Sequence, residues 1–219
     1  MKQFKQFKGV YEENGKLWTK SFVAGSVYGE RTVYINSEEY HEWIPERSKL
    51  AAGLLNGISQ IGIKPDSIVL YLGSGSGTTP SHVSDIIGEN GFIFALDFAP
   101  RVVRDLWFLC DKRKNMAPLL ADANHPETYS HLVSAVDVIY MDVAQRNQAE
   151  IFLKNINKFL KQGGFGILCV KARSVDVTKK PSEIFKKVRD ELKKETIIVD
   201  YKELSPYEKD HAMFVVKKK

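Results

Sequence analysis

A glycine-rich turn is the first feature of this sequence that could do chemistry. The stretch YLGSGSGTTP, residues 71–80, holds three glycines within five residues and then two threonines. It follows an apolar run, SIVL, and precedes SHVSDIIG, a segment suited to a helix. Glycines let the backbone approach a ligand closely, and the N-terminus of the next helix offers N–H donors. The turn is therefore a candidate ligand site.

The spacing within the turn excludes two common nucleotide sites. A P-loop requires a lysine after its last glycine, whereas Thr78 follows Gly77 here. A dinucleotide fingerprint needs G-x-G-x-x-G, whereas Gly73, Gly75 and Gly77 form G-x-G-x-G. A nicotinamide-dependent oxidoreductase is therefore disfavoured. The turn suits a nucleoside ligand that carries no pyrophosphate.

Acidic residues follow the next strands of the predicted sheet. Asp97 ends the second strand, Asp122-Ala123 ends the third, and Asp142 ends the fourth. A carboxylate at Asp97 accepts hydrogen bonds from a ribose diol, and contacts to an adenine edge fall near Asp122. A single acid at a strand end could belong to an ordinary turn. Three acids together with the glycine turn favour a site, and we infer S-adenosylmethionine as the ligand of a methyltransferase.

Alternating helices and strands must position these residues from Ser48 onward. SKLAAGLLNGISQIGI (48–63) has leucines and isoleucines at helical spacing, with Ser48 as its N-cap. Further helices are predicted at 79–88, 100–114, 126–134, 146–161 and 181–194. Strands are predicted at 67–72, 91–97, 117–122, 136–142, 164–172, 195–204 and 211–217. The strands are continuous apolar runs, as expected when both faces of a sheet are covered, which predicts a doubly wound α/β domain. SPYEKD is too short for a crossover, so the last two strands should form an antiparallel hairpin.

The first 47 residues follow a different pattern, typical of antiparallel β structure. Apolar and aromatic residues flank Asn14-Gly15, which is a strong signal for a type I′ hairpin. SVYGERTVYI (26–35) adds β-branched and aromatic residues. We therefore predict a small N-terminal antiparallel β domain over residues 1–47 and an α/β domain over residues 48–219.

Composition sets broad limits on the function. Hydrophobic residues make up 43% and charged residues 27% of the 219 residues, as in globular proteins. The net charge of +5 is weak evidence for phosphate-rich partners. Cys110 and Cys169 lie in apolar surroundings, which indicates reduced thiols, and no Cys/His group has zinc spacing. No signal peptide or membrane-spanning run is recognised, so we expect a cytoplasmic protein without a metal site.

Six motifs together resemble fibrillarin, the S-adenosylmethionine-dependent RNA 2′-O-methyltransferase family of C/D box ribonucleoproteins. They are YLGSGSGTTP, ALDFAPR, ADANHPETY, VDVIYMDVAQRNQA, KARSVD with a following TKKP, and LSPYEKDHA. The resemblance covers nearly the whole chain and is to the archaeal form, because a Gly/Arg-rich N-terminal extension is not seen. It implies a Rossmann-like methyltransferase fold, with a seven-stranded mixed sheet, helices on both faces and a small N-terminal β domain.

Two positions near the cofactor site differ from common patterns. Tyr71 stands two residues before the first glycine, where many methyltransferases have an acid, and the fibrillarin pattern also has this tyrosine. The ribose-binding acid is often Glu in the family, whereas here it is Asp97. The shorter side chain makes cofactor affinity the property that we expect to differ.

The resemblance also implies a catalytic tetrad of Lys, Asp, Lys and His, with Glu as a variant at the fourth position. Carried over by motif, these are Lys49, Asp142, Lys171 and His211, and Glu203 is a rival to His211. A ribose 2′-hydroxyl is a weak nucleophile, so a base or a nearby positive charge assists it. A lysine can act as a base when desolvation or a second cation lowers its pKa. We expect Lys171 to act as base or hydroxyl orienter, Asp142 to hold its ammonium or orient the methyl donor, and Lys49 and His211 to bind the target ribose and phosphate.

For the cofactor, the resemblance implies residues at four successive strand ends. They are Gly73, Gly75, Thr78, Thr79, Asp97, Phe98, Asp122, Ala123, Asp142 and Gln145. Phe98 is expected to pack on the adenine, because it comes directly after the ribose acid. Core packing is the alternative interpretation of Phe98.

The partners follow from the resemblance alone. It implies a C/D box guide RNA that selects nucleotides in rRNA or tRNA, a Nop-domain scaffold protein and a kink-turn-binding ribosomal-type protein, without a membrane. Three alternatives stay open: a methyltransferase of proteins (a glutamine among them) or small molecules, a non-catalytic RNA-holding subunit, and a nicotinamide oxidoreductase. Lys49 and Lys171 disfavour the first, and the intact glycine turn with its acids disfavours the second.

Overall fold

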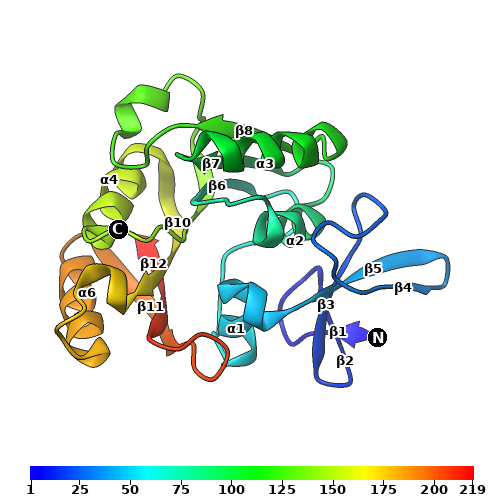
Figure 1. Ribbon diagram of the computed structural model, residues 1–219, viewed down its shortest axis with the longest axis horizontal. Coiled ribbons are helices and arrows are strands. Elements are labelled where there is room, and N and C mark those ends of the chain that lie inside the picture. Colours follow the sequence, from blue (N-terminus) through cyan, green and yellow to red (C-terminus); the bar gives the residue numbers. More distant parts are fainter.

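The computed structural model describes residues 1–219 and contains two β-sheets (Figure 1). The N-terminal sheet has the strand order β1-β2-β3-β5-β4. Its strands are β1 (Lys2–Gln3), β2 (Val10–Glu13), β3 (Lys16–Lys20), β4 (Thr32–Ile35) and β5 (Glu38–Trp43). A 3₁₀ turn, η1 (Pro45–Arg47), and helix α1 (Lys49–Leu55) connect it to the larger sheet.

The larger sheet has seven strands in the order β11-β12-β10-β9-β6-β7-β8. They are β6 (Ile68–Leu72), β7 (Phe92–Asp97), β8 (Met116–Leu120), β9 (Val136–Met141), β10 (Leu160–Lys171), β11 (Thr196–Glu203) and β12 (His211–Lys218). The helical segments between them are α2 (Thr78–Ile87), α3 (Pro100–Lys112), η2 (Pro126–Tyr129), α4 (Gln148–Phe159), α5 (Ala172–Val175) and α6 (Pro181–Glu195). None of these helices is long and apolar enough to cross a lipid bilayer.

Strand directions confirm the predicted mixed sheet. Strands β10, β9, β6, β7 and β8 are parallel to their neighbours, and β12 runs antiparallel to both β10 and β11. The chain first moves from β6 to β7 and β8, then returns to place β9 on the other side of β6. In such open sheets, ligands bind outside the carboxyl ends of the strands near this reversal.

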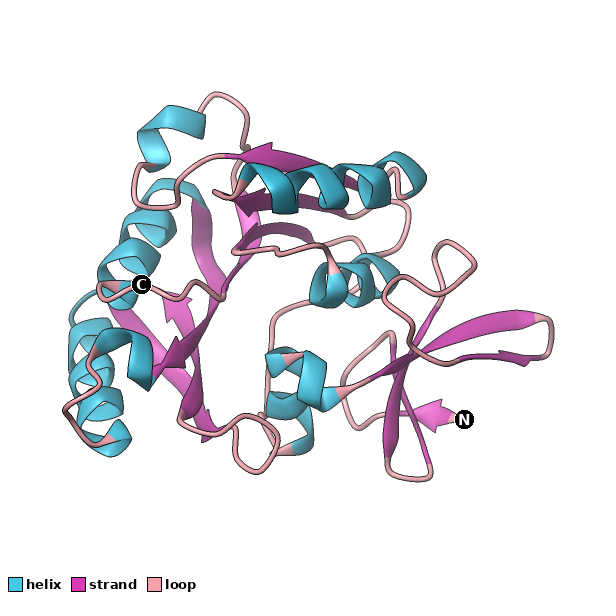
Figure 2. Ribbon diagram, viewed as in Figure 1, coloured by secondary structure: helices cyan, strands magenta, loops and turns pink.

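Two hydrophobic cores cover the two faces of the larger sheet, because successive side chains of a strand point to opposite faces. Val69 and Tyr71 of β6 belong to one core, together with side chains of α1, α2 and α3. Leu70 and Leu72 belong to the other, together with side chains of α4, α6 and η2. In Figure 2 the strands accordingly separate α4 and α6 from α1 and α2.

The N-terminal sheet does not have a core of its own. Phe4, Phe7, Leu17 and Trp43 pack in the same hydrophobic cluster as α1 and α2. The predicted domain boundary at residue 47 therefore stays a prediction, since one core runs through both parts. The type I′ hairpin is confirmed: Asn14-Gly15 joins β2 to β3, and both residues have positive φ, 52° and 74°.

Two predicted helices are shorter in the structure than the sequence suggested. The helix expected over 48–63 ends at Leu55, because Gly57 takes a left-handed conformation (φ 86°) and closes a Schellman motif. The helix expected over 126–134 is only the four-residue 3₁₀ turn η2. Thr128 to His131, in the middle of the predicted helix, are weak helix formers, which explains why η2 ends at Tyr129. Helix α5 was not predicted.

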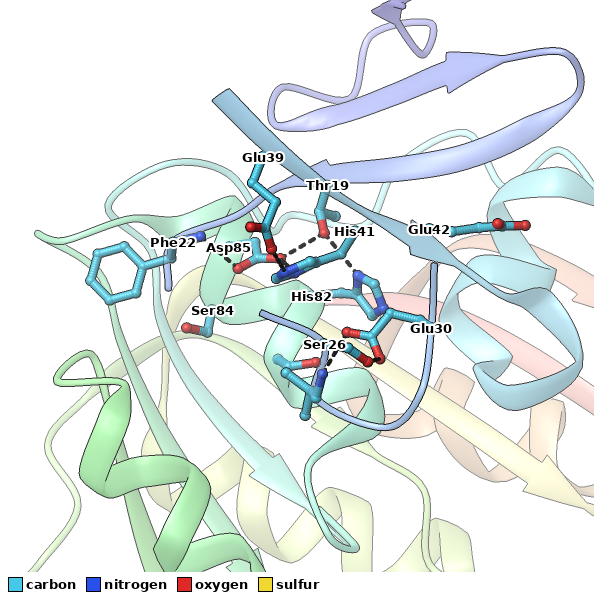
Figure 3. Close-up of polar contacts among 12 residues, drawn as sticks. Thr19, Phe22, Ser26, Glu30, Glu39, His41, Glu42, His82, Ser84 and Asp85 are labelled. Atoms are coloured by element: carbon cyan, nitrogen blue, oxygen red, sulfur yellow. Dashed lines mark hydrogen bonds and ion pairs between the residues drawn. The ribbon is translucent and has the colours of Figure 1, made fainter. Parts of the chain in front are cut away.

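A buried polar network joins the N-terminal sheet to α2 (Figure 3). Asp85 of α2 accepts hydrogen bonds from Thr19 (2.7 Å) and His41 (3.0 Å), and its other oxygen pairs with Arg113 (2.7 Å). Burial works to raise the pKa of Asp85, but the hydrogen bond from His41 and the charges of Arg113 and His41 lower it. Asp85 is therefore held as a carboxylate.

His82 occupies the centre of this network as a neutral imidazole. Burial lowers its pKa to about 3. Thr19 donates its proton to Asp85, so its oxygen accepts from Nδ1–H of His82 at 2.8 Å. Nε2 of His82 then accepts from the hydroxyl of Tyr28, also at 2.8 Å. In this arrangement both ring nitrogens of the neutral His82 have a hydrogen-bond partner.

We expect His82 to make the protein less stable as the pH falls from 6.5 toward 3. In this range unfolded His82 binds a proton that the folded protein excludes, so the free energy of unfolding rises with pH. Replacing His82→Gln should flatten this dependence by up to about 1.4 kcal/mol per pH unit. Urea unfolding at pH 4.5, 5.25 and 6.0 measures the slope, and His131→Gln, at an exposed histidine, is the control. Equal slopes for wild type and His82→Gln would contradict the assignment.

Candidate functional site

The glycine turn lies against the loop that follows β9. The N–H groups of Gly73 and Ser74 both donate to the carbonyl of Leu96, at 2.9 and 3.0 Å. Gly73 has a φ of +82°, and a Cβ built on it would lie 2.3 Å from the carbonyl oxygen of Asp142. Only glycine allows this approach, which sets the position of Asp142 relative to the turn.

A cavity of about 420 Å³ opens at the carboxyl ends of β6, β7, β8 and β9. Eight of the ten predicted cofactor residues line it: Gly73, Gly75, Asp97, Phe98, Asp122, Ala123, Asp142 and Gln145. Leu96, Ala121, Val143 and Ala144 complete the lining. The strand ends thus bring together acids and small residues that are far apart in the sequence, as the topology requires.

Asp97 and Phe98 form one side of the cavity. One carboxylate oxygen of Asp97 accepts from the N–H of Gly75 at 3.0 Å, and the other accepts from the N–H of Ala99 at 3.1 Å. Phe98 is 68% exposed, so its ring does not pack in the core. An exposed aromatic ring next to a fixed carboxylate provides a stacking surface beside a diol acceptor.

Sequence reasoning missed Asn124, which contacts two residues of the cavity lining without lining the cavity itself. Asn124 donates to the carboxylate of Asp122 through its backbone N–H at 2.9 Å and to Gln145 through its side chain at 2.8 Å. Asn147 in turn donates to Asn124 at 3.0 Å. Asn124 therefore orients two predicted site residues. Its place in the ADAN segment, directly after Asp122-Ala123, was the available signal.

The two predicted threonines lie at the start of α2, outside the residues that line the cavity. Thr78 is the first residue of α2, and Gly77 before it has a left-handed φ of 102°. Thr79 is buried, and its hydroxyl donates to the hydroxyl of Ser48 at 3.0 Å. Their contact with a cofactor stays a prediction.

Lys49 and Asp142 form an ion pair at the edge of the cavity. The ammonium of Lys49 donates to Oδ2 of Asp142 at 2.8 Å, and their side chains are 18% and 27% exposed. The sequence suggested that Asp142 could hold Lys171, but the structure pairs it with Lys49. The reason is the position of α1, whose small residues let it pack closely on the sheet: a Cβ on Gly53 would lie 2.7 Å from the sulfur of Met213.

The pairing fixes the charge of Lys49. Burial works to lower its pKa, but the charge of Asp142, its hydrogen bond and the more distant charge of Glu208 raise the pKa above its ordinary value. Lys49 is therefore a permanent cation, and it does not accept a proton near neutral pH.

Lys171 and His211 lie opposite each other across β10 and β12. Such cross-strand partners point to the same face of the sheet. Because side chains alternate, this is the face of Cys169 and Met213, which also carries α1 and hence Lys49. Lys171 is exposed, and its backbone N–H donates to the side chain of Gln148 at 3.2 Å.

The geometry distinguishes the two candidates for the fourth tetrad position. Nδ1–H of His211 donates to the carbonyl of Lys209 at 2.7 Å, so in the neutral imidazole Nε2 carries no proton and is the acceptor. Glu208, which sequence reasoning missed, lies 3.6 Å from Nδ1 of His211. Glu203 lies on the outermost strand, β11, where it is exposed and accepts from Tyr201. The arrangement favours His211.

The site thus combines three chemical elements. The cavity offers a diol acceptor and an aromatic surface, which suit a nucleoside. A permanent cation, Lys49, lies at its edge beside Asp142. A second amine, Lys171, and an imidazole acceptor, His211, lie on the same face. Such a group can bind a nucleoside-containing donor and activate a hydroxyl acceptor next to it.

Comparisons with known proteins identify relatives of this chain. The fibrillarin family model matches residues 1–219. A fibrillarin-like rRNA/tRNA 2′-O-methyltransferase from Thermococcus gammatolerans is 52% identical, over 97% of each chain. The crystal structure of Aeropyrum pernix fibrillarin with natively bound S-adenosyl-L-methionine has a TM-score of 0.91 and 45% identity, over 98% of this chain and 96% of that one. A fibrillarin/Nop5p complex contains a chain with a TM-score of 0.88 and 42% identity, over 97% of this chain and 98% of that one.

Proposed function

Because the chain belongs to the fibrillarin family, we propose that it transfers a methyl group from S-adenosylmethionine to the ribose 2′-hydroxyl of RNA. It does so as the catalytic subunit of a C/D box ribonucleoprotein. The observation that carries the proposal is the Lys49–Asp142 pair at the edge of a nucleoside-sized cavity, on the face that also holds Lys171 and His211.

The residues of the cavity fit S-adenosylmethionine. Asp97 matches a ribose diol, and the exposed ring of Phe98 matches an adenine. Gly75 has open space where a Cβ would lie, so its backbone can contact a ligand. The relative from Aeropyrum pernix binds this molecule, which supports the assignment. When bound, it supplies a methyl group on a positively charged sulfur, which leaves as a neutral thioether.

The chain's own charges then act on the acceptor hydroxyl. Lys49 remains protonated, so its ammonium stabilises negative charge that develops on the ribose oxygen. Asp142 orients Lys49 through the 2.8 Å hydrogen bond. Burial strengthens both interactions, since both side chains are mostly shielded from water.

The proton of the 2′-hydroxyl needs an acceptor other than Lys49. We assign this role to Lys171, which ends β10 on the same face. The proton passes to the lone pair of its neutral amine as the ribose oxygen takes up the methyl group, and the resulting ammonium then releases the proton to water. His211 presents Nε2 as a hydrogen-bond acceptor that holds the target ribose.

We infer the substrates and partners of this chain from its family. The relative from Thermococcus gammatolerans is named an rRNA/tRNA 2′-O-methyltransferase, so we assign RNA substrates to this chain. Another relative forms a complex with Nop5p, so we assign a Nop-domain scaffold as a partner of this chain. A C/D box guide RNA that selects the target nucleotide and a kink-turn-binding protein that anchors the guide complete the proposed particle. The net charge of +5 is compatible with RNA contact.

One transfer experiment tests the acceptor atom. The protein is assembled with a Nop-domain scaffold, a kink-turn protein and a designed C/D guide RNA, and given methyl-labelled S-adenosylmethionine. One target RNA matches the guide, and a second differs only in a 2′-deoxy nucleotide at the target position. We expect label in the first RNA and none in the second. Equal labelling of both RNAs would place the methyl group on another atom of the RNA, such as a base atom, and would overturn the proposed function.

A further inference from the structure

Ser48 lies at a junction of three structural elements. It is the N-cap of α1, directly before Lys49, and it is only 1% exposed. Its hydroxyl oxygen accepts from the indole N–H of Trp43, at the end of β5, at 2.9 Å. It also accepts from the hydroxyl of Thr79 in α2 at 3.0 Å. These two donors occupy the two acceptor positions of the hydroxyl, and the N–H of Ala51 makes a longer contact at 3.4 Å.

Trp43 is itself held in place. Its ring stacks on the imidazole of His82 with centroids 5.0 Å apart and planes at 16°. His82 is fixed by Thr19 and Tyr28 on its two nitrogens, as Figure 3 shows for Thr19. The hydrogen bond from Trp43 to Ser48 therefore has a rigid donor, and it anchors the start of α1 to the N-terminal sheet.

The start of α1 needs such an anchor. Lys49 places a cation at the N-terminus of a helix, where the helix dipole disfavours positive charge, and the first turn has no acidic residue. The helix is only seven residues long, so its own backbone bonds give it little stability. The link from Ser48 to Thr79 connects Lys49 to the helix that follows the glycine turn.

We propose that Ser48 is a positioning residue for methyl transfer, which holds the ammonium of Lys49 at Asp142 through its bonds to Trp43 and Thr79. The inference rests on the proposed function, because it assigns Ser48 a role in the same reaction. Ser48 does not contact substrate; it acts through Lys49. A displacement of Lys49 by about 1 Å is enough to lower the rate by about two orders of magnitude.

The test compares single-turnover methylation by assembled particles that carry Ser48→Ala, Trp43→Phe or Leu55→Ala. Ser48→Ala should lower the rate roughly 10–100-fold. Trp43→Phe keeps an aromatic ring for the stack and loses one hydrogen bond, so a loss of roughly 5-fold is expected. Leu55→Ala destabilises the same helix away from Ser48, and should leave the rate within about twofold of wild type well below the unfolding temperature. S-adenosylmethionine affinity, measured by calorimetry, should change less than about threefold for Ser48→Ala.

A double-mutant cycle separates positioning from general destabilisation. In a Lys49→Met background, Ser48→Ala should lower the methylation rate by less than a further factor of about two, because its effect passes through Lys49. An equal loss in both backgrounds, or a Ser48→Ala rate within about twofold of wild type, would overturn the proposal.

A measurement without turnover keeps this inference separate from the proposed function. The ¹³Cε signal of Lys49, assigned by its absence in Lys49→Met, is titrated in wild type and Ser48→Ala. The pKa of Lys49 should move down from its raised value toward the ordinary one when Ser48 is lost. An unchanged pKa would overturn the role of Ser48 even if the wild-type particle methylated no RNA. Absence of methylation by the wild-type particle would count against the proposed function alone.

Discussion

Lys171→Ala is expected to lower the rate of methyl transfer by roughly 10²–10⁴-fold while leaving S-adenosylmethionine affinity nearly unchanged. The reason is that the two lysines of the site have different roles. Lys49 is fixed as a cation by Asp142 and cannot take the proton of the 2′-hydroxyl. Lys171 lies outside the lining of the proposed cofactor cavity, so its loss should remove no cofactor contact. Single-turnover rates with the assembled particle, with calorimetry of cofactor binding, measure both quantities.

Two further variants sharpen this prediction. Lys171→Arg keeps the positive charge. Because an arginine stays protonated in a protein, it has no neutral form that could accept the proton, so this variant should be as inactive as Lys171→Ala. Lys161→Ala removes a lysine from the other end of the same strand, where it pairs with Asp137, and should leave the rate unaffected. If Lys171→Arg retained near wild-type activity, Lys171 would supply charge rather than accept a proton.

Gly73→Ala is expected to weaken cofactor binding and to destabilise the fold. A Cβ at this position would lie 2.3 Å from the carbonyl oxygen of Asp142, which is backbone and cannot rotate away. The left-handed φ of +82° adds strain for any residue with a Cβ. We expect the free energy of unfolding to fall by roughly 2–4 kcal/mol. The affinity for S-adenosylmethionine should fall by at least about tenfold, because the turn and Asp142 must move apart.

Gly163→Ala is the matched control for backbone strain. Gly163 has a similar φ of +71°, but a Cβ there meets nothing within 4 Å. Gly163→Ala should therefore lower the free energy of unfolding only by the conformational strain, roughly 1–2 kcal/mol, and should not change cofactor binding. Urea unfolding and calorimetry of all three proteins make the comparison. A Gly73→Ala protein that binds the cofactor as wild type does would show that the contact with Asp142 is dispensable.

The strand ends explain why much of the site could be predicted from sequence. Asp97, Asp122 and Asp142 each follow a continuous apolar run, and parallel strands bring their carboxyl ends to one edge. These local signals place eight predicted residues around one cavity. The fold could be predicted from the same signals, because buried parallel strands appear in a sequence as continuous apolar runs.

Other parts of the site depend on contacts that no local pattern contains. The pairing of Lys49 with Asp142 joins residues 93 positions apart and depends on how α1 packs on the sheet. Ser48 was predictable as an N-cap, but its bonds to Trp43 and Thr79 require the N-terminal sheet and α2 to meet. Asn124 and Glu208 looked like loop residues, since their partners come from other loops or from the start of β12. The helix predicted over 126–134 was overestimated because the weak helix propensity of Thr128 to His131 was not taken into account.

The position of β12 has a consequence for how the protein is made. This strand follows the other six in sequence but lies inside the sheet, between β10 and β11, and contributes a buried run from Ala212 to Val216. During synthesis from the N-terminus, the growing chain therefore exposes two unpaired sheet edges until residues 211–218 leave the ribosome. The same residues bring His211 to Lys171. Completion of the sheet and completion of the proposed catalytic face are thus one event, so a nascent chain that lacks β12 has neither.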